Sequence, residues 1–285
     1  MFNFLHSFLP SPVLWDLGII QIHWYGLLIA AAVFLCFWLG LKMAIKAKLN
    51  QDQFINLVFY LVIFGLLGAR LWHVLFYNFA YFFANPWAIF KIWQGGLAIY
   101  GAIVAGLIVL FVYCRKHRLL FWNLADILAM VLPLGQAIGR WGNYFNQELF
   151  GLPCNFNWCI PIAVVNRPEQ FINFVYFHPV FLYESILCFL LFAYIWLFLK
   201  NKNILAGSIA LFYLGGYALI RFFTEFLRLD SVKGLGNLTW VQWFCLAVFL
   251  ITTIWYLKFA NKKRRLSGGT DGTRTRDLLR DREAL

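Results

Sequence analysis

Seven long apolar runs constrain what this chain can fold into more than any other feature. Each is close to the ~20 residues that an α-helix needs to cross a bilayer, and a soluble fold has no core large enough to bury so many. The composition agrees, since 62% of the residues are hydrophobic and 13% are charged, with a mean hydropathy of +0.72. The runs cover Gly18–Leu41, Phe54–Tyr77, Gly96–Cys114, Leu124–Asn143, Pro179–Leu199, Leu205–Arg221 and Leu238–Lys258. The sequence therefore predicts an all-α polytopic membrane protein with seven transmembrane helices.

The basic residues predict how these helices are oriented. Lysines and arginines cluster after the first, third, fifth and seventh runs, at Lys42–Lys48, Arg115–Arg118, Lys200–Lys202 and Lys258–Arg265. The loops after the even runs carry few. By the positive-inside rule the N-terminus is outside and the C-terminus is in the cytoplasm. The net charge of +12 thus reflects topology, and we expect no nucleic-acid partner.

The chain divides into a membrane domain, residues 1–265, and a short tail. Within the domain the connection 144–178 is the longest and faces outward, so we expect a small extracytoplasmic head with a functional role. The tail, residues 266–285, is polar, net neutral and unable to bury a core, which predicts a disordered appendage. Cys154 and Cys159 in the head form either a disulfide or two free thiols. We expect no metal and no cofactor.

One polar stretch, Gly139–Gly151, follows the fourth apolar run. It carries Arg140, Asn143, Asn146 and Glu148, and placing such groups near hydrocarbon is costly enough that function is the default explanation. The glycines just before and within it share a helix face with one another and favour close packing of a neighbouring helix. The polar groups are therefore expected in a packed interior.

Other polar residues are expected at the same depth. Arg70, Arg140 and Arg221 lie about 24 Å along a helix from the starts of their outward-running spans, at a rise of ~1.5 Å per residue. The inward-running spans begin at that outer side with further polar residues, namely His23, Tyr25, Tyr100 and Glu184. All of these polar residues are therefore expected on the outer-leaflet side of the membrane.

The sixth run adds a stripe, because Tyr217, Arg221, Glu225 and Arg228 share a face if the helix continues. Glu225 can then orient Arg221 by a charge-assisted pair. Interfacial arginines often reach to lipid headgroups, and interfacial tryptophans often anchor helices. We interpret four residues in that way: Arg70, Arg228, Trp24 and Trp240. For Arg140 and Arg221 we favour function, and two such arginines at headgroup level suit a phosphate ester.

The pattern G-R-x-G-N-[YF]-x-N-x-E-x-x-G at residues 139–151 resembles the signature of the prolipoprotein diacylglyceryl transferase family. The resemblance extends through HWYG, GG-L-x-x-Y-G, HP-x-x-LYE and R-F-x-x-E-F-x-R. It implies transfer of the diacylglyceryl group of phosphatidylglycerol to the lipobox cysteine thiol of prolipoproteins, with a thioether formed and glycerol phosphate released. This reaction is the first step of bacterial lipoprotein maturation. The resemblance also implies a multi-pass protein of the cytoplasmic membrane with its active site toward the outer leaflet.

The polar pattern and the resemblance together predict roles for residues of this chain. The catalytic group comprises Arg140, Arg221, Tyr100, His23 and Tyr217. The substrate-binding group comprises Tyr25, Arg140, Asn143, Asn146, Glu148, Gly151, Glu184 and Glu225. Many family members carry a histidine, a favoured general base, where this chain has Tyr100, and tyrosine is a poor base at pH 7. Another group then takes the proton, with His23 the nearest alternative, or the arginine field alone activates the thiol.

Two other functions compete with this interpretation. A transporter or channel for an anionic solute or lipid ranks second. Such proteins usually show repeated halves and sites at the bilayer midplane, whereas this chain has seven dissimilar spans and its charges gather at one face. A purely structural scaffold ranks third, because it would not require arginine, asparagine and glutamate in one region.

Overall fold

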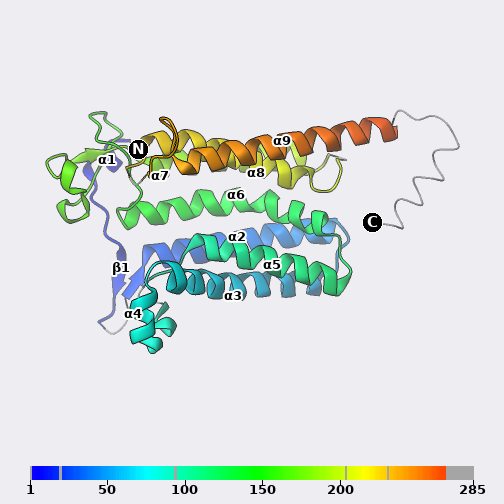
Figure 1. Cartoon of the computed structure of the whole chain (residues 1–285), viewed down its shortest axis with the longest axis horizontal. Coiled ribbons are helices and arrows are strands. Elements are labelled where there is room, and N and C mark those ends of the chain that lie inside the picture. The colour runs from blue at the N-terminus through cyan, green and yellow to red at the C-terminus, as the bar shows by residue number, and fades with distance from the viewer. Residues whose placement is uncertain (1, 19–20, 93–94, 203, 230, 268–285) are drawn as a thin grey trace. The chain divides into compact units, whose positions relative to one another are not determined.

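The computed structural model describes residues 2–18, 21–92, 95–202, 204–229 and 231–267. Within this part of the chain, seven helices are long and apolar enough to cross a membrane, which confirms the predicted fold class. They are α2 (Trp24–Lys46), α3 (Gln51–Phe76), α5 (Ile99–His117), α6 (Phe121–Phe145), α7 (Val180–Tyr194) with the π-helical turn η5 (Ile195–Leu199), α8 (Ser208–Thr224) with the 3-10 turn η6 (Glu225–Leu227), and α9 (Trp240–Ser267) (Figure 1).

The first transmembrane helix begins later than expected. The run was predicted to start at Gly18, but β1 (Val13–Asp16) and β2 (Gln21–His23) form an antiparallel ribbon before α2. The Asp16 carboxylate accepts hydrogen bonds from the Gly18 backbone N–H (2.9 Å) and from the Gln21 side chain (3.0 Å), and these bonds hold the pKa of Asp16 below its usual range. A polar turn therefore interrupts the apolar run.

The sixth transmembrane helix also differs from its predicted end at Arg221. It continues through η6 to Leu227, because Arg221 and Glu225 pair with each other at 2.7 Å and need not leave the helix to find partners. The expected tail boundary differs as well, since Leu266 and Ser267 belong to α9. Residues 268–285 of the predicted appendage lie outside the described residues.

The chain forms two compact units, and unit 2 comprises Phe37–Ile127. In it α3 and α5 lie side by side (Figure 1), and the connection between them contains α4 (Phe79–Ala84) and η1 (Pro86–Phe90). The two long helices approach closely at Gly68. A Cβ atom there would lie 2.5 Å from the Ala105 Cβ and 2.6 Å from the Gly101 carbonyl oxygen, so only glycine fits without a shift.

Arg70 does not reach toward lipid headgroups, and that prediction was wrong. Its side chain is buried, and the residue is only 7% exposed. The guanidinium donates to four carbonyl oxygens of the α3–α5 connection, those of Ala88 (2.6 Å), Ile89 (2.9 Å), Gly95 (2.7 Å) and Gly96 (3.0 Å). The physical reason is that this connection folds back over α3 and brings four backbone carbonyl groups within hydrogen-bond distance of the guanidinium. Arg70 is a structural residue of unit 2.

Unit 1 comprises Met1–Cys36 and Leu128–Leu285. Here α7, α8 and α9 pack in sequence order, and residues 144–178 fold into a small head. The head contains a short antiparallel ribbon of β3 (Ile160–Pro161) and β4 (Tyr176–Phe177), and two 3-10 turns, η3 (Val164–Asn166) and η4 (Glu169–Phe171). Cys154 and Cys159 are joined by a disulfide, the first of the two alternatives left open by the sequence.

The head is stabilised by a hydrophobic core that the N-terminal segment completes. Phe150, Ile162, Phe177 and Phe181 are buried in it together with Leu5, which comes from the short helix α1 (Phe2–Ser7). The helix α1 was not predicted, because six residues are too few to leave a periodic pattern in the sequence.

Candidate active site

The site in unit 1 is centred on Glu184, in the first turns of α7. Its side chain is 1% exposed and is shared by two arginines. Arg140 of α6 pairs through Nε with Oε2, and Arg221 of α8 pairs through Nη1 with Oε1 at 2.5 Å. Thr224 donates its hydroxyl to Oε1 at 2.9 Å. Three helices thus bring together two guanidinium groups on one buried carboxylate.

Arg140 also contacts the residues that follow it on α6 and a tyrosine of α8. Its Nη1 lies 3.5 Å from the Asn143 Oδ1, and its Nη2 lies 3.4 Å from the Tyr217 hydroxyl. Both contacts are at the long limit of a hydrogen bond. The outer donors of Arg140 are therefore only weakly engaged, and they remain available to an anion.

The end of α6 turns the rest of the polar stretch back toward Arg140. Asn143 donates its amide to the Glu148 Oε1 at 2.8 Å, and Asn146 contacts the same oxygen at 3.4 Å. The turn depends on positive φ angles at Gln147 (52°) and Leu149 (56°). Glu148 itself is exposed. The structure thus brings together Arg140, Asn143, Asn146 and Glu148, which the sequence analysis had grouped by pattern.

Glu225 holds Arg221 from the other side. The predicted pair is present, with Arg221 Nη2 2.7 Å from Glu225 Oε2. Arg228 approaches the same oxygen at 3.9 Å. Hydroxyl groups of Ser231 (2.8 Å) and Thr239 (3.3 Å) satisfy Oε1. Sequence reasoning missed both hydroxyls and Thr224. Only Thr224 could have been found, because it lies on α8 one turn from Arg221.

Tyr25 lies against Gly142. His23, two residues before Tyr25, is the last residue of strand β2. A Cβ atom on Gly142 would overlap the Tyr25 ring, 2.9 Å from its Cε2 atom, so the glycine makes room for the tyrosine. Tyr25 is 38% exposed. His23 is exposed and pairs with Val13. Trp24, interpreted as a membrane anchor, stacks on Phe145 with ring centroids 4.5 Å apart.

Gly151 contributes through its backbone. Its N–H donates to the His178 carbonyl at 2.9 Å, and the residue forms a bridge with Arg228. A Cβ atom there would meet the Leu227 carbonyl oxygen and the Val180 Cγ2, each at 2.7 Å. The glycine therefore lets three chain segments cross at the edge of the site. Its assigned contact with substrate stays a prediction.

Tyr100 belongs to unit 2 and not to unit 1, which contains the arginines. It lies in the first turn of α5, is 54% exposed, and has its ring 6.3 Å from that of Trp72. Its catalytic role stays a prediction.

The donors of the site suit an anion. Three arginines, Arg140, Arg221 and Arg228, pair with Glu184 and Glu225, and Glu148, 2.8 Å from the Asn143 amide, supplies a third carboxylate, so the site has no net charge. The Arg140 and Arg221 side chains are 19% and 15% exposed, enough for a ligand to reach them. The described residues contain no group of three or more His, Cys, Asp or Glu side chains placed to hold a metal ion.

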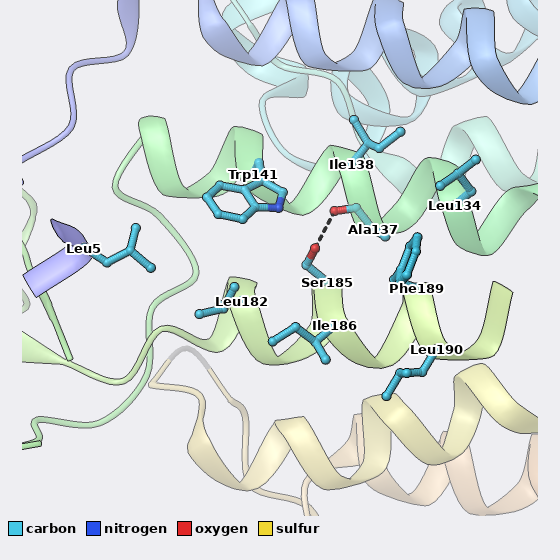
Figure 2. A pocket seen from close by; sticks show the side chains of 10 residues that line it. All are labelled: Leu5, Leu134, Ala137, Ile138, Trp141, Leu182, Ser185, Ile186, Phe189 and Leu190. Atoms are coloured by element: carbon cyan, nitrogen blue, oxygen red, sulfur yellow. Dashed lines mark hydrogen bonds between the residues drawn. The ribbon is translucent and has the colours of Figure 1, made fainter. Parts of the chain in front are cut away.

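An open apolar groove of about 440 Å³ runs between α6 and α7 (Figure 2). Ser185 crosses it to donate a hydrogen bond to the Ala137 carbonyl at 2.8 Å, drawn as the dashed line in Figure 2. The groove is lined by Leu134, Ala137, Ile138 and Trp141 of α6, Leu182, Ser185, Ile186, Phe189 and Leu190 of α7, and Leu5 of α1. The helices that carry Arg140 and Glu184 therefore also border a hydrophobic surface.

Comparison with known proteins decides the family. The family model described as prolipoprotein diacylglyceryl transferase matches residues 12–258. The chain belongs to this family. It is 44% identical over 254 residues to the phosphatidylglycerol–prolipoprotein diacylglyceryl transferase of a Synechocystis species, covering 86% of this chain and 87% of that protein. The transferases of Thermosynechococcus vestitus (42% identity over 80% of this chain and 84% of the relative) and Gloeobacter violaceus (40% over 87% and 93%) are also similar.

Membership in the family makes this chain a membrane-embedded transferase. The competing interpretation as a transporter or channel is not favoured, because the match covers all seven spans.

Proposed function

We propose that the cluster around Glu184 binds the phosphate of phosphatidylglycerol and that the chain transfers the diacylglyceryl group to the lipobox cysteine of a prolipoprotein. The observation that carries the proposal is the pair of guanidinium groups on one buried carboxylate. Glu184 fixes the positions of both arginines, while the Arg140 Nη groups make only long contacts. A planar fork with weakly engaged donors suits a phosphate ester.

The proposed chemistry is a displacement at carbon. The cysteine thiolate attacks the terminal glyceryl carbon of the diacylglyceryl group, a carbon–sulfur bond forms, and the carbon–oxygen bond to phosphate breaks. The bonding electron pair leaves with the phosphate oxygen, so the products are a thioether and glycerol phosphate. Arg140 and Arg221 are placed to stabilise the charge that develops on that oxygen, an effect typically worth about 3–4 kcal/mol per donor.

The thiol must lose its proton before it attacks. A cysteine with an ordinary pKa of about 8.5 is only a few per cent ionised at neutral pH, so a base or a positive field assists. The guanidinium groups of Arg140 and Arg221 favour the thiolate over the neutral thiol. We assign the His23 imidazole as the base. His23 immediately precedes Trp24 and Tyr25 at the start of α2, and Tyr25 lies against Gly142 of the polar stretch. The Tyr100 hydroxyl then donates a hydrogen bond to the lipid headgroup or to the leaving oxygen.

The apolar groove supports an amphiphilic substrate. Leu182 and Ser185 flank Glu184 on α7 and also line the groove. A lipid with a phosphate headgroup and acyl chains can therefore place each part against matching surface on the same helix. We place the reaction at the outer leaflet of the bacterial cytoplasmic membrane, on the basis of the loop charges.

The test uses the purified full-length protein in micelles that contain phosphatidylglycerol. Glycerol phosphate should be released only when a lipobox peptide is added, and the peptide should gain the mass of a diacylglyceryl group. A peptide with serine in place of its cysteine should give no release. Release without peptide, or no mass gain with it, would contradict the proposal.

Substitution of the arginines sharpens the test. Arg140→Lys should lower turnover about 10²–10³-fold although the charge is retained, because lysine cannot pair with Glu184 and also present a fork to phosphate. Arg221→Lys should behave alike. If both variants keep near-normal transfer, the arginines do not bind the phosphate.

A further inference from the structure

Three successive side chains near the start of α7 contact three different parts of unit 1. Tyr183 reaches the head, where its hydroxyl lies 3.0 Å from the Trp158 Nε1. Glu184 holds Arg140 and Arg221. Ser185 donates to a carbonyl of α6. Neighbouring residues on a helix point in directions about 100° apart, so this short segment is fixed from three sides, and Glu184 is in the middle.

The start of α7 depends on such contacts, because no side chain caps it. Pro179 occupies the N-cap position and makes no capping hydrogen bond. The Tyr183 hydroxyl instead joins the helix to the head through two partners, accepting from the Trp158 indole N–H and lying 3.1 Å from the His178 Nδ1. An indole N–H can only donate, so the direction of the first bond is settled.

Trp158 is itself held by a closed loop. The Cys154–Cys159 disulfide closes the segment that contains it, and the Phe156 N–H donates to the Cys159 sulfur at 3.2 Å. The Phe156 and Trp158 rings stack with centroids 4.6 Å apart and planes within 5°. The indole is thereby oriented toward Tyr183.

We propose that Tyr183 and Trp158 are positioning residues for the transfer reaction, acting through Glu184 on the two arginines. The inference rests on the proposed function. The Tyr183–Trp158 bond ties the turn that carries Glu184 to the disulfide-closed loop, and a small displacement of that turn moves the carboxylate on which both guanidinium groups rest. Displacements of about 1 Å from a reacting centre can lower a rate by as much as 10²-fold. The bond itself is partly exposed, since Trp158 is 39% exposed, so its loss should affect geometry more than folding.

The experiment is a double-mutant cycle in the micelle assay. Trp158→Phe keeps a ring that can stack on Phe156 and removes the indole donor, and Tyr183→Phe keeps its ring and removes the acceptor. Each should lower kcat about tenfold with KM changed less than about twofold, because the loss falls on transition-state stabilisation. Tyr183→Phe also removes the contact with His178, so the double variant should fall no further than Tyr183→Phe alone, because the indole has no partner left to lose once the hydroxyl is gone. Multiplied losses, or wild-type kcat in either single variant, would overturn the proposal.

Two further variants separate positioning from general integrity of the head. Arg167→Lys weakens bonds to the carbonyls of Ile162 (2.8 Å) and Ile172 (3.0 Å), which stay within the head, and should keep wild-type kcat. The double variant Cys154→Ser/Cys159→Ser opens the loop and should reproduce the Trp158→Phe loss. If Arg167→Lys lowers kcat as much as Trp158→Phe does, head integrity alone is responsible and the proposal fails. If the wild-type protein shows no transfer, the proposed function fails instead.

Discussion

At the scale of single residues, Glu184 is the buried carboxylate that Arg140 and Arg221 share. A carboxylate that is 1% exposed and pairs with two arginines has exchanged all of its water for protein contacts. Removing one partner of a buried ion pair leaves an uncompensated charge, and this is more damaging than the pair itself is stabilising. A substitution of Glu184 should therefore lower both the transfer activity and the stability of the protein.

Glu184→Gln tests this directly. The amide preserves shape but leaves two guanidinium groups without their shared anion, so we expect transfer to fall at least about 10²-fold and the free energy of unfolding to fall by about 3–5 kcal/mol. Activity assays and thermal unfolding in detergent measure the two effects. Glu148→Gln is the matched control, because Glu148 is exposed and its loss should leave the unfolding midpoint nearly unchanged. Equal midpoints for the two variants would contradict the buried network.

His178 predicts how the head responds to pH. Partial burial lowers the pKa of His178 below its ordinary value. In the unfolded chain the imidazole titrates near its ordinary pKa of about 6.5, so below that pH the unfolded state binds protons more readily than the folded state. The stability contribution is therefore complete above pH ~6.5 and is lost as pH falls toward the lowered pKa.

Unfolding midpoints of the wild type and of His178→Gln, measured from about pH 8 to pH 5, check this dependence. The wild-type midpoint should fall relative to that of the variant below pH ~6.5. Parallel curves over the whole range would show that His178 does not contribute to the pH dependence of the unfolding midpoint.

At the scale of elements, the contact between α3 and α5 depends on the absence of a side chain. Gly68→Ala would place a Cβ within 2.6 Å of Gly101 backbone and against Ala105, so the helices must separate, at a cost of about 1–3 kcal/mol. Gly65→Ala, one turn away on the same helix, meets nothing within 4 Å and should be neutral or stabilising. The unfolding midpoint should therefore fall in Gly68→Ala and stay unchanged or rise in Gly65→Ala, and equal shifts in the two variants would exclude close packing at Gly68.

The elements show what could and could not be predicted from the sequence. Long apolar runs located all seven transmembrane helices, because hydrocarbon thickness sets a length that few other structures require. The start at Gly18 was wrong, because the Asp16 turn depends on two local hydrogen bonds that hydropathy does not register. The burial of Arg70 was missed because it depends on where the α3–α5 connection folds.

In the site, too, some contacts could be predicted from the sequence and others could not. The i, i+4 pair of Arg221 and Glu225 follows from helical spacing and was predicted. That Glu184 would serve Arg140 and Arg221 together could not be predicted, because these residues lie on three helices whose packing no local pattern specifies. Ser231 and Thr239 were missed for the same reason, since isolated hydroxyls in a loop carry no spacing signal.

At the scale of the whole molecule, the loop charges predict which ends of the helices face outward. A labelling experiment needs introduced cysteines, because Cys154 and Cys159 are joined in a disulfide. Val165→Cys, at a position 88% exposed in the head, should react with a membrane-impermeant maleimide in intact cells. Ala47→Cys, in the exposed turn after α2, should react only after the cells are opened. Reaction of both in intact cells would contradict the predicted topology, and reaction of Ala47→Cys alone would indicate the reverse orientation.

The buried disulfide has a further consequence for a transferase whose proposed acceptor is a cysteine thiol. A thiolate can attack a disulfide sulfur, and the outcome is a mixed disulfide between two proteins. The prolipoprotein cysteine is therefore a hazard to the head of the enzyme that modifies it. Cys159 is 0% exposed and Cys154 is 7% exposed, so burial protects both sulfur atoms from an attacking thiolate.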